Sequence, residues 1–365
     1  MVEFNTRVTS IDPAMPDHTA IQEAATLIRS GELVAFPTET VYGLGGDGLN
    51  PESLRRIYTV KGRPPDNPLI LHVASQQQLL SVAAEVPDVA YTLMRTFWPG
   101  PLTLVLPKAP QVPDLATGGL PTVALRMPDH PVALALIRQA GTPLAGPSAN
   151  RSGCPSPTTA QHVLDDFDGR ISLILDAGPT PIGLESTVLD VTCTPAVILR
   201  PGGITREALE AVIGRLQEGA DLAQRQRSPG TRYRHYSPKA RVLLLAEAQK
   251  ETLQASVAEA LQHHERVGCL LYRLDAEDVP PNVKVARVGG SVTDYAQMLF
   301  SALRALDGLG LDVIVVEGVQ EQGLGVAVMD RLRRAASPPR PSTGYTESPV
   351  PDAPICERQL PEQSR

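Results

Sequence analysis

Lys61 and Arg63 are two cations separated by a single residue, in a segment that also contains Asn67 and His72. Gly62 and three prolines interrupt the segment 61–72, so it is not predicted to form one continuous helix. Cations on a rigid, turning segment are suited to converge on an anion. The planar fork of arginine matches phosphate or carboxylate better than the point charge of lysine does. The spacing therefore indicates a nucleotide site.

Two further polar residues lie inside predicted strands. In the run 69–73, alternation puts Ile70 and His72 on one face. His72 then either points into a cleft or is a hydrogen-bonded core histidine. Arg126 lies in the predicted strand 123–127, where a buried charge is costly unless it is paired. Arg126 must therefore meet either a partner carboxylate or a ligand.

Hydroxyls and glycines gather in two loops. The run 37–46 (PTETVYGLGG) follows a predicted strand and precedes a predicted helix, so it either turns backbone N–H groups toward an anion or forms a plain glycine turn. The run 146–156 follows the predicted strand 143–145, and is either a ligand loop at a strand end or a surface turn. Polar anchors recur at 184–188 and 199–203. No nucleophile with its base stands out, so catalysis should depend on positioning and charge neutralisation.

Composition excludes several classes of protein. Aromatic residues make up only 4% of the 365 residues, and the formal net charge is -7, which argues against a stacking-dominated or broadly electrostatic nucleic-acid reader. The four cysteines lie far apart with no CxxC pair, so neither a disulfide framework nor a zinc site is expected. No signal peptide and no apolar run of about 20 residues is found. The sequence predicts a cytoplasmic protein.

The elements that must position these residues alternate between strand and helix. Strands are predicted at 33–37, 69–73, 102–106, 123–127, 143–145, 172–175, 187–191 and 197–199. Helices are predicted at 21–30, 51–61, 75–84, 87–97, 130–140, 158–166 and 205–217. Asn50 followed by Pro51 is typical of a helix start. This pattern predicts a sizeable α/β domain with a twisted mixed sheet over residues 1–218.

The remaining chain is predicted to divide into three parts. Residues 219–240 form a basic linker, because no acidic residue occurs between Asp221 and Glu247 while six basic ones do. We expect this linker to fold over the nucleotide as a lid. Residues 241–337 alternate strands at 242–245, 267–272 and 313–317 with helices at 248–262, 292–306 and 326–336, which predicts a small Rossmann-like parallel sheet. Residues 338–365, rich in proline and serine, are predicted to be disordered.

Taken in order, these segments resemble the threonylcarbamoyl-AMP synthase family in its two-domain form, a YrdC-like catalytic domain followed by a Rossmann-like C-terminal domain. The resemblance covers roughly residues 15–336. It is carried by eight motifs: PTETVYGLG, KGRPPDNPLILHV, FWPGPLTLVL, VALRMPDHP, PSANRSG, ESTVLDV, ILRPGG and SPGTRYRHYSP. The family is a nucleotidyltransferase that makes L-threonylcarbamoyladenylate and pyrophosphate from L-threonine, bicarbonate or CO2, and ATP. Its product serves the N6-threonylcarbamoyl modification of adenosine 37 in tRNA.

The resemblance also implies roles for individual residues. Lys61 and Arg63 would be catalytic. The L-threonine site would comprise Thr40, His72, Arg126, Gly146 and Ser186. The ATP site would comprise Lys61, Arg63, Asn67, Thr122, Ser148, Ser156, Arg200 and Tyr236. The family often has alanine where this chain has Gly146, whose contact is expected to be through backbone.

The resemblance further implies ATP as a substrate, with Mg2+ carried by the nucleotide and no metal site on the protein. The product would pass to the tRNA threonylcarbamoyltransferase machinery. Two alternatives remain, a non-enzymatic YrdC-like module that binds double-stranded RNA or tRNA, and a carbamoyl-transferring maturation factor. The second would carry an acylphosphatase-like segment and CxxC zinc fingers, which this sequence lacks.

Overall fold

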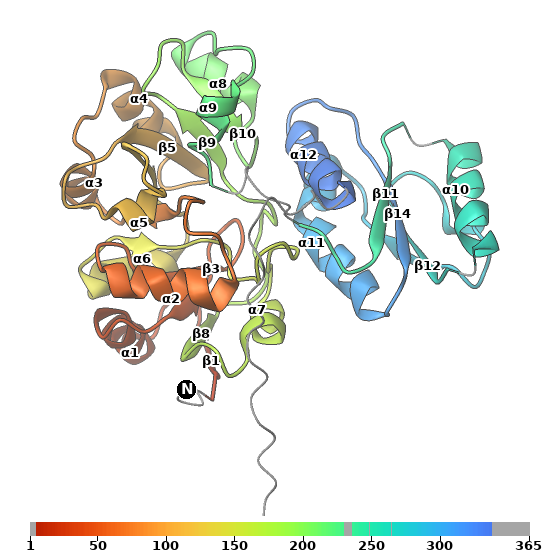
Figure 1. The fold of residues 1–365 in the computed structure, drawn as a ribbon, viewed down its shortest axis with the longest axis horizontal. Helices are drawn as coiled ribbons and strands as arrows, with labels where there is room; N and C mark the ends of the chain where they lie inside the picture. The colour runs from red at the N-terminus through yellow and green to blue at the C-terminus, as the bar shows by residue number, and fades with distance from the viewer. Residues whose placement is uncertain (1–4, 230–235, 248, 264, 338–365) are drawn as a thin grey trace, which may run out of the picture.

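The computed structural model describes residues 5–229, 236–247, 249–263 and 265–337. These residues form two lobes, each built on its own sheet (Figure 1). The larger sheet has ten strands and the smaller has four. The predicted fold class is therefore confirmed: an α/β lobe with a mixed sheet is followed by a separate Rossmann-like lobe with a parallel sheet.

The strands of the larger lobe are β1 (Arg7–Ser10), β2 (Val34–Phe36), β3 (Gly43–Asp47), β4 (Ile70–His72), β5 (Leu102–Pro107), β6 (Thr122–Arg126), β7 (Leu144–Ala145), β8 (Leu173–Asp176), β9 (Thr187–Asp190) and β10 (Val197–Arg200). Its helices are α1 (His18–Arg29), α2 (Pro51–Lys61), α3 (Gln76–Val82), α4 (Asp88–Phe97), α5 (Asp114–Thr117), α6 (Pro131–Ala140), α7 (Ala160–Phe167) and α8 (Arg206–Ile213). A short helix, α9 (Leu222–Arg225), lies in the predicted linker.

The smaller lobe contains the strands β11 (Arg241–Leu245), β12 (Val267–Leu271), β13 (Lys284–Arg287) and β14 (Val313–Glu317). Its helices are α10 (Lys250–Gln262), the 3-10 turn η1 (Ala276–Asp278), α11 (Val292–Gly308) and α12 (Gly325–Ala336). The sheet order is β11-β14-β12-β13, and all its strand pairs are parallel. In Figure 1, α11 and α12 face the larger lobe, whereas α10 covers the opposite side of the sheet.

The larger sheet runs in the order β1-β8-β2-β3-β7-β4-β6-β5-β9-β10. Helices α1 and α6 pack against β2 and β8 in one apolar cluster. Helices α2, α3, α4 and α7 contribute to a second and larger cluster with β4, β5 and β6. The other face of β4, β6, β5, β9 and β10 carries a small cluster of buried side chains, namely Ile70, Val105, Ala124, Val188, Val197 and Leu199. This last face holds the candidate site.

Local sequence accounts for several element boundaries. The Asn50 side chain accepts a hydrogen bond from the Glu52 N–H, and Pro51 occupies the first turn, so α2 begins where the capping residues predict. At the other end Gly62 adopts φ 60° and ends the helix, a conformation that favours glycine. The chain therefore reverses immediately after Lys61 and delivers Arg63 to a different surface from the helix.

Three strands were missed by the sequence analysis. Residues 43–47 were expected in a loop, but they form β3, an antiparallel partner of β2. Glycines are needed there because a Cβ on Gly43 would lie 2.9 Å from the Phe36 ring. Both interpretations of this run, an anion-facing loop and a plain turn, are therefore wrong for the residues in β3. The edge strands β1 and β13 were not predicted because each carries exposed polar residues at its ends.

The two lobes share an apolar interface. Val41 and Leu184 of the larger lobe pack in the same buried cluster as Tyr295, Leu299 and Phe300 of α11. At the same interface a Cβ on Gly183 would lie 2.4 Å from the backbone oxygen of Gln297, so the lobes meet at backbone distance. The larger lobe and α11 are thus held as closely as neighbouring elements of one core.

The proposed boundaries at 218, 240 and 337 remain predictions. Within the proposed linker the described residues include α9 and Tyr236, whereas 230–235 lie outside the described residues. The predicted disordered tail, 338–365, also lies outside them. No described helix is long and apolar enough to cross a membrane.

Candidate active site

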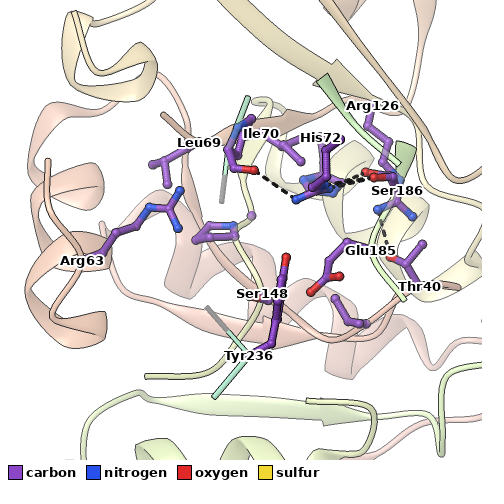
Figure 2. Close-up of a pocket in the computed structure, with 15 residues that line it drawn as sticks. Thr40, Arg63, Leu69, Ile70, His72, Arg126, Ser148, Glu185, Ser186 and Tyr236 are labelled. Carbon is purple, nitrogen blue, oxygen red and sulfur yellow. Dashed lines mark hydrogen bonds between the residues drawn. The ribbon is translucent and has the colours of Figure 1, made fainter. Parts of the chain in front are cut away.

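A cavity opens beside β4 and β6, on the side to which Ile70, His72 and Arg126 project (Figure 2). Its volume is about 50 Å³, space for a few water-sized groups. It is lined by Thr40, Val41, Arg63, Leu69, Ile70, His72, Arg126, Gly146, Pro147, Ser148, Glu185, Ser186, Arg200, Pro229 and Tyr236. Segments more than 190 residues apart in the chain thus meet around one space. All five residues of the predicted threonine site are among them.

His72 projects into the cavity from β4. Within β4 the predicted alternation is confirmed, since Ile70 and His72 line the cavity while Leu71 packs in the core beneath; Leu69, just before the strand, also lines the cavity, against the predicted alternation. The His72 Nδ1 atom is buried and has no hydrogen-bond partner among the described residues. Burial and the nearby charge of Arg126 lower the pKa of His72 to about 3, so the imidazole is neutral at physiological pH. His72 is therefore a cavity residue and can accept or donate one hydrogen bond to a ligand.

Gly146 forms the wall behind His72. A Cβ at this position would lie 2.7 Å from His72 Nδ1 and 3.1 Å from the Phe36 ring. The ring of Phe36 in turn meets His72 edge-on, with centroids 5.9 Å apart. Gly146 thus leaves room for the imidazole as well as presenting backbone to the cavity, which the sequence analysis did not anticipate.

Arg126 resolves the alternative that the sequence left open. Its Nη2 atom forms a 2.6 Å ion pair with Glu39 Oε2. Nη1 donates to Thr40 Oγ1 at 2.9 Å, and Nε donates to the Gly100 carbonyl at 3.2 Å. Arg126 therefore meets a partner carboxylate, which is one of the two predicted alternatives. Nη2 has no hydrogen-bond partner among the described residues, and its contact with a ligand stays a prediction.

Ser186 directly precedes β9, and Arg200 ends β10, the antiparallel neighbour of β9. The register of β9 and β10 shifts between Ile198 and Arg200, and this irregularity lets both Leu199 and Arg200 face the cavity side. Arg200 donates through Nε and Nη2 to the Ser186 carbonyl, at 3.2 and 2.9 Å. The Ser186 hydroxyl shares a 2.7 Å hydrogen bond with Thr103. The two residues therefore form one rigid corner.

Arg63 lines the opposite end of the cavity. Its Nη2 donates to Asn67 Oδ1 and to the Pro68 carbonyl, each at 2.7 Å, and Nε donates to the Asn67 carbonyl at 3.2 Å. Burial lowers the pKa of Arg63 from 12.5 to about 10, so it remains cationic at neutral pH. Asn67 is fully buried and does not line the cavity; in this structure it holds the guanidinium of Arg63.

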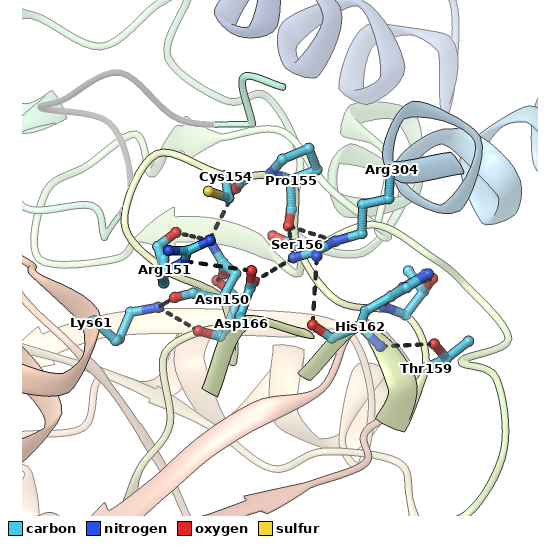
Figure 3. Close-up of polar contacts among 12 residues, drawn as sticks. Lys61, Asn150, Arg151, Cys154, Pro155, Ser156, Thr159, His162, Asp166 and Arg304 are labelled. Atoms are coloured by element: carbon cyan, nitrogen blue, oxygen red, sulfur yellow. Dashed lines mark hydrogen bonds and ion pairs between the residues drawn. The ribbon is translucent and has the colours of Figure 1, made fainter. Parts of the chain in front are cut away.

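Lys61 is buried beside the cavity but does not line it. Its ammonium donates to the Ser148 carbonyl at 2.6 Å and to the Asn150 carbonyl (Figure 3). Burial, with Arg63 nearby, moves the pKa of Lys61 well below its usual value. Through these two hydrogen bonds Lys61 holds the loop that carries Ser148, and Ser148 lines the cavity. Its predicted phosphate contact and catalytic role remain predictions.

Of the other predicted ATP contacts, some line the cavity and some do not. Ser148 and Tyr236 line the cavity, whereas Thr122 and Ser156 do not. Ser156 is fully buried and its hydroxyl donates to Glu185 Oε1 at 2.5 Å. The hydroxyl of Thr122, on β6, has no hydrogen-bond partner among the described residues. The roles of both residues as ATP contacts remain predictions.

Two residues of the predicted linker, Pro229 and Tyr236, line the cavity. Arg200 Nη1 donates to the Pro229 carbonyl at 3.2 Å, and the Tyr236 ring stacks on Phe300 of α11 with centroids 5.3 Å apart. Arg227, another residue of the predicted linker, forms a 2.9 Å ion pair with the buried Asp190.

Glu185 lines the cavity and was not selected from the sequence. Besides Ser156 it contacts Arg331 of α12, whose Nε donates to Glu185 Oε2 at 2.8 Å. The sequence could have indicated Glu185 as a site residue, because it directly precedes Ser186 in the polar run 184–188 at the start of a predicted strand. The sequence could not indicate its partner Arg331, because the two residues are 146 positions apart.

Among the described residues, no group of three or more His, Cys, Asp or Glu side chains is placed to hold a metal ion. The site instead presents three guanidinium groups, four side-chain hydroxyls, one carboxylate and a neutral imidazole around one space. Such a site can bind anions and orient them, but it offers no nucleophile activated by a base.

Comparison with known proteins gives concordant results. Residues 26–202 match the Sua5_yciO_yrdC family model, described as telomere recombination, and residues 204–337 match the model for the C-terminal domain of threonylcarbamoyl-AMP synthase. Threonylcarbamoyl-AMP synthase of Pyrococcus abyssi is 48% identical over 87% of this chain and 94% of its own length. The Bacillus subtilis enzyme of that name is also 48% identical, over 87% of this chain and 92% of its own length. A crystal structure of P. abyssi Sua5 complexed with L-threonine superposes with a TM-score of 0.85 at 46% identity, covering 91% of this chain and 98% of that one.

Proposed function

Because this chain belongs to the threonylcarbamoyl-AMP synthase family, we propose that its cavity converts L-threonine, bicarbonate or CO2, and ATP into L-threonylcarbamoyladenylate and pyrophosphate. The single observation that carries the proposal is the convergence of Arg63, Arg126 and Arg200 on one cavity from three separate segments. Glu39 and Glu185 offset part of the charge of these buried cations, and anionic ligands would offset the rest. The substrates of this reaction supply such anions.

We assign the threonine end of the cavity to Thr40, His72, Arg126, Gly146 and Ser186. Arg126 suits the carboxylate of threonine, because a guanidinium can bind both oxygens. Neutral His72, with the hydroxyls of Thr40 and Ser186, is suited to the amine and the side-chain hydroxyl. The methyl group of threonine adds only about 1–3 kcal/mol of discrimination against serine, whereas a hydroxyl partner left unpaired rejects valine more strongly.

The proposed nucleotide contacts that line the cavity are Arg63, Ser148, Arg200 and Tyr236, of which Arg200 lies beside Ser186. Lys61, Asn67, Thr122 and Ser156 complete the proposed ATP site, with Lys61 and Arg63 as the proposed catalytic cations. In this structure Lys61 and Asn67 support Ser148 and Arg63, so their variants are expected to act at least partly through those residues. Mg2+ would arrive with the nucleotide and neutralise phosphate charge, since the described residues provide no metal-binding cluster.

The chemistry proceeds in two steps. The amine of threonine adds to the carbon of CO2, forms an N–C bond and loses a proton, which yields a carbamate. A carbamate oxygen then attacks the α-phosphorus of ATP, the P–O bond to the leaving group breaks, and pyrophosphate departs. Neither step needs a covalent enzyme intermediate. The protein has to hold two anions together against their repulsion, and the arginines provide the opposing charge.

We also infer that the linker acts as a lid. The cavity that Pro229 and Tyr236 line measures about 50 Å³, below the several hundred Å³ of a typical ligand pocket. This small volume supports the proposal that the linker moves to admit ATP, and closure behind the nucleotide would exclude water that hydrolyses the mixed anhydride. Replacing 227–236 by a Gly-Ser segment of equal length should lower synthesis more than threonine affinity. Unchanged synthesis would contradict the lid.

In the cell, the product is proposed to pass to the tRNA threonylcarbamoyltransferase machinery in the cytoplasm, for modification of adenosine 37. The decisive experiment is ATP consumption and pyrophosphate release with and without L-threonine and bicarbonate, with the adenylate identified by mass. Threonine-dependent formation of that adenylate is the expected result. Binding of structured RNA without threonine-dependent ATP consumption would instead favour the non-enzymatic RNA-binding alternative.

A further inference from the structure

We propose that Arg331, contributed by the smaller lobe, is a positioning residue of the cavity that neutralises Glu185 and so keeps the nucleotide end attractive to a polyphosphate. The inference rests on the proposed function, because it concerns the ATP end of that same site. It also gives the smaller lobe a defined role in the site, to provide the counter-charge for a carboxylate that the larger lobe exposes to its substrate.

Arg331 is fully buried at the interface between the lobes. Its Nε donates to Glu185 Oε2 at 2.8 Å, and its Nη1 donates to the Pro201 carbonyl at 2.9 Å. Its guanidinium carbon lies 5.3 Å from the centre of the Tyr236 ring. Arg331 therefore contacts Glu185, which precedes Ser186, and Pro201, which follows Arg200. It also contacts Tyr236 of the predicted linker.

Glu185 is the carboxylate that needs this partner, because it lines a cavity proposed to hold polyanions. Burial raises the pKa of Glu185, but the charges of Arg331 and Arg200 outweigh burial, so that the pKa lies below its usual value and the group is ionised. The charged and titratable groups around it are Arg331 and Asp330 of α12, Arg200 of β10, and Tyr236. Asp330 pairs with Arg331 and also with Arg334. Because the carboxylate of Asp330 is shared between two arginines, it neutralises only part of the positive charge of Arg331.

The position of Arg331 is set by the fold. Its neighbours Val328 and Leu332 pack in the apolar cluster that also holds Leu184, so α12 is anchored beside the Glu185 segment. Without Arg331, Glu185 would keep Ser156 and the more distant Arg200 as partners among the described residues. A triphosphate entering the cavity would then meet a carboxylate with less positive charge around it, and its binding should weaken.

The test uses the full-length chain and the dissociation constant of Mg·ATP measured by calorimetry. Arg331→Met should raise this constant about 10- to 100-fold, while the constant for L-threonine changes less than about threefold. Adding Glu185→Gln to Arg331→Met should return ATP binding to within about fivefold of wild type, because the uncompensated charge is gone. In Arg331→Met alone, ATP binding should also improve as pH falls and Glu185 becomes protonated.

The control is Arg304→Met, which breaks a second ion pair between the lobes, the 2.6 Å contact with Asp166 shown in Figure 3. It should lower stability and leave ATP binding within about threefold, and Glu185→Gln should not improve ATP binding in that background. Unchanged ATP binding in Arg331→Met, or a loss that Glu185→Gln does not relieve, would overturn the proposal.

If Arg331→Met does not fold, the double variant carries the test alone. Near wild-type ATP binding in the double variant supports neutralisation, and binding weakened more than tenfold refutes it. The proposed function is judged separately, by whether the wild-type protein makes the adenylate. A wild type that binds ATP but makes no adenylate would contradict the function and leave the binding result for Arg331 interpretable.

Discussion

Replacing Arg126 by methionine should separate ligand recognition from folding. The side chain is 3% exposed and contacts Glu39, Thr40 and the Gly100 carbonyl. Methionine keeps much of the volume but removes the charge, and Glu39, itself 5% exposed, loses its ion-pair partner. Breaking a buried pair on one side costs about 3–5 kcal/mol of folding free energy. The variant should therefore be substantially less stable.

The expected loss of threonine affinity has a different origin. One or two charge-assisted hydrogen bonds to the threonine carboxylate are worth about 1.5–3 kcal/mol each. Losing about 2–4 kcal/mol corresponds to a dissociation constant about 30- to 1000-fold higher. Calorimetric titration with L-threonine gives this constant, and urea unfolding gives the stability.

The double variant Glu39→Gln/Arg126→Met separates the two effects. It removes both charges, so stability should recover by about 2 kcal/mol or more, whereas threonine affinity should stay low because no guanidinium is present. Arg304→Met, which breaks a buried pair away from the cavity lining, should lose stability and retain threonine affinity. Threonine binding within threefold of wild type in Arg126→Met would refute the assignment. Affinity that recovers together with stability in the double variant would refute it equally.

Two further predictions follow from the same cavity. Arg63→Ala should slow pyrophosphate release by roughly 10²–10³-fold, by analogy with loss of one oxyanion-hole donor, and near-normal release would show that the phosphate assignment is misplaced. For His72, the pKa of about 3 in the folded protein lies below the ordinary 6.5, so the unfolded chain binds the proton first and stability falls as pH drops from 6.5 toward 3. Between pH 7 and pH 5 the unfolding free energy of wild type should fall by about 2 kcal/mol more than that of His72→Asn, and identical pH slopes in urea unfolding would contradict the buried neutral imidazole.

Much of the local structure could be predicted because its causes lie within a few residues. The Asn50 cap and Pro51 fix the start of α2, and alternation in β4 puts Ile70 and His72 on the cavity side. The eight motifs were sufficient to identify the family and both lobes, which the comparisons confirm. The run 43–47 could not be recognised as a strand, because its glycines match the side chain of Phe36 on another strand and not any local pattern.

The sequence by itself determined which residue types the site contains and which elements carry them, since capping, alternation and turn chemistry act over short distances. Only the tertiary structure decided what each polar group faces. The β9/β10 irregularity turns Arg200 to the cavity, Lys61 turns to the carbonyls of a loop 87 residues away, and Arg331 of the second lobe pairs with Glu185. These choices depend on which segments become buried together, because a buried charge must find a partner wherever the fold brings one.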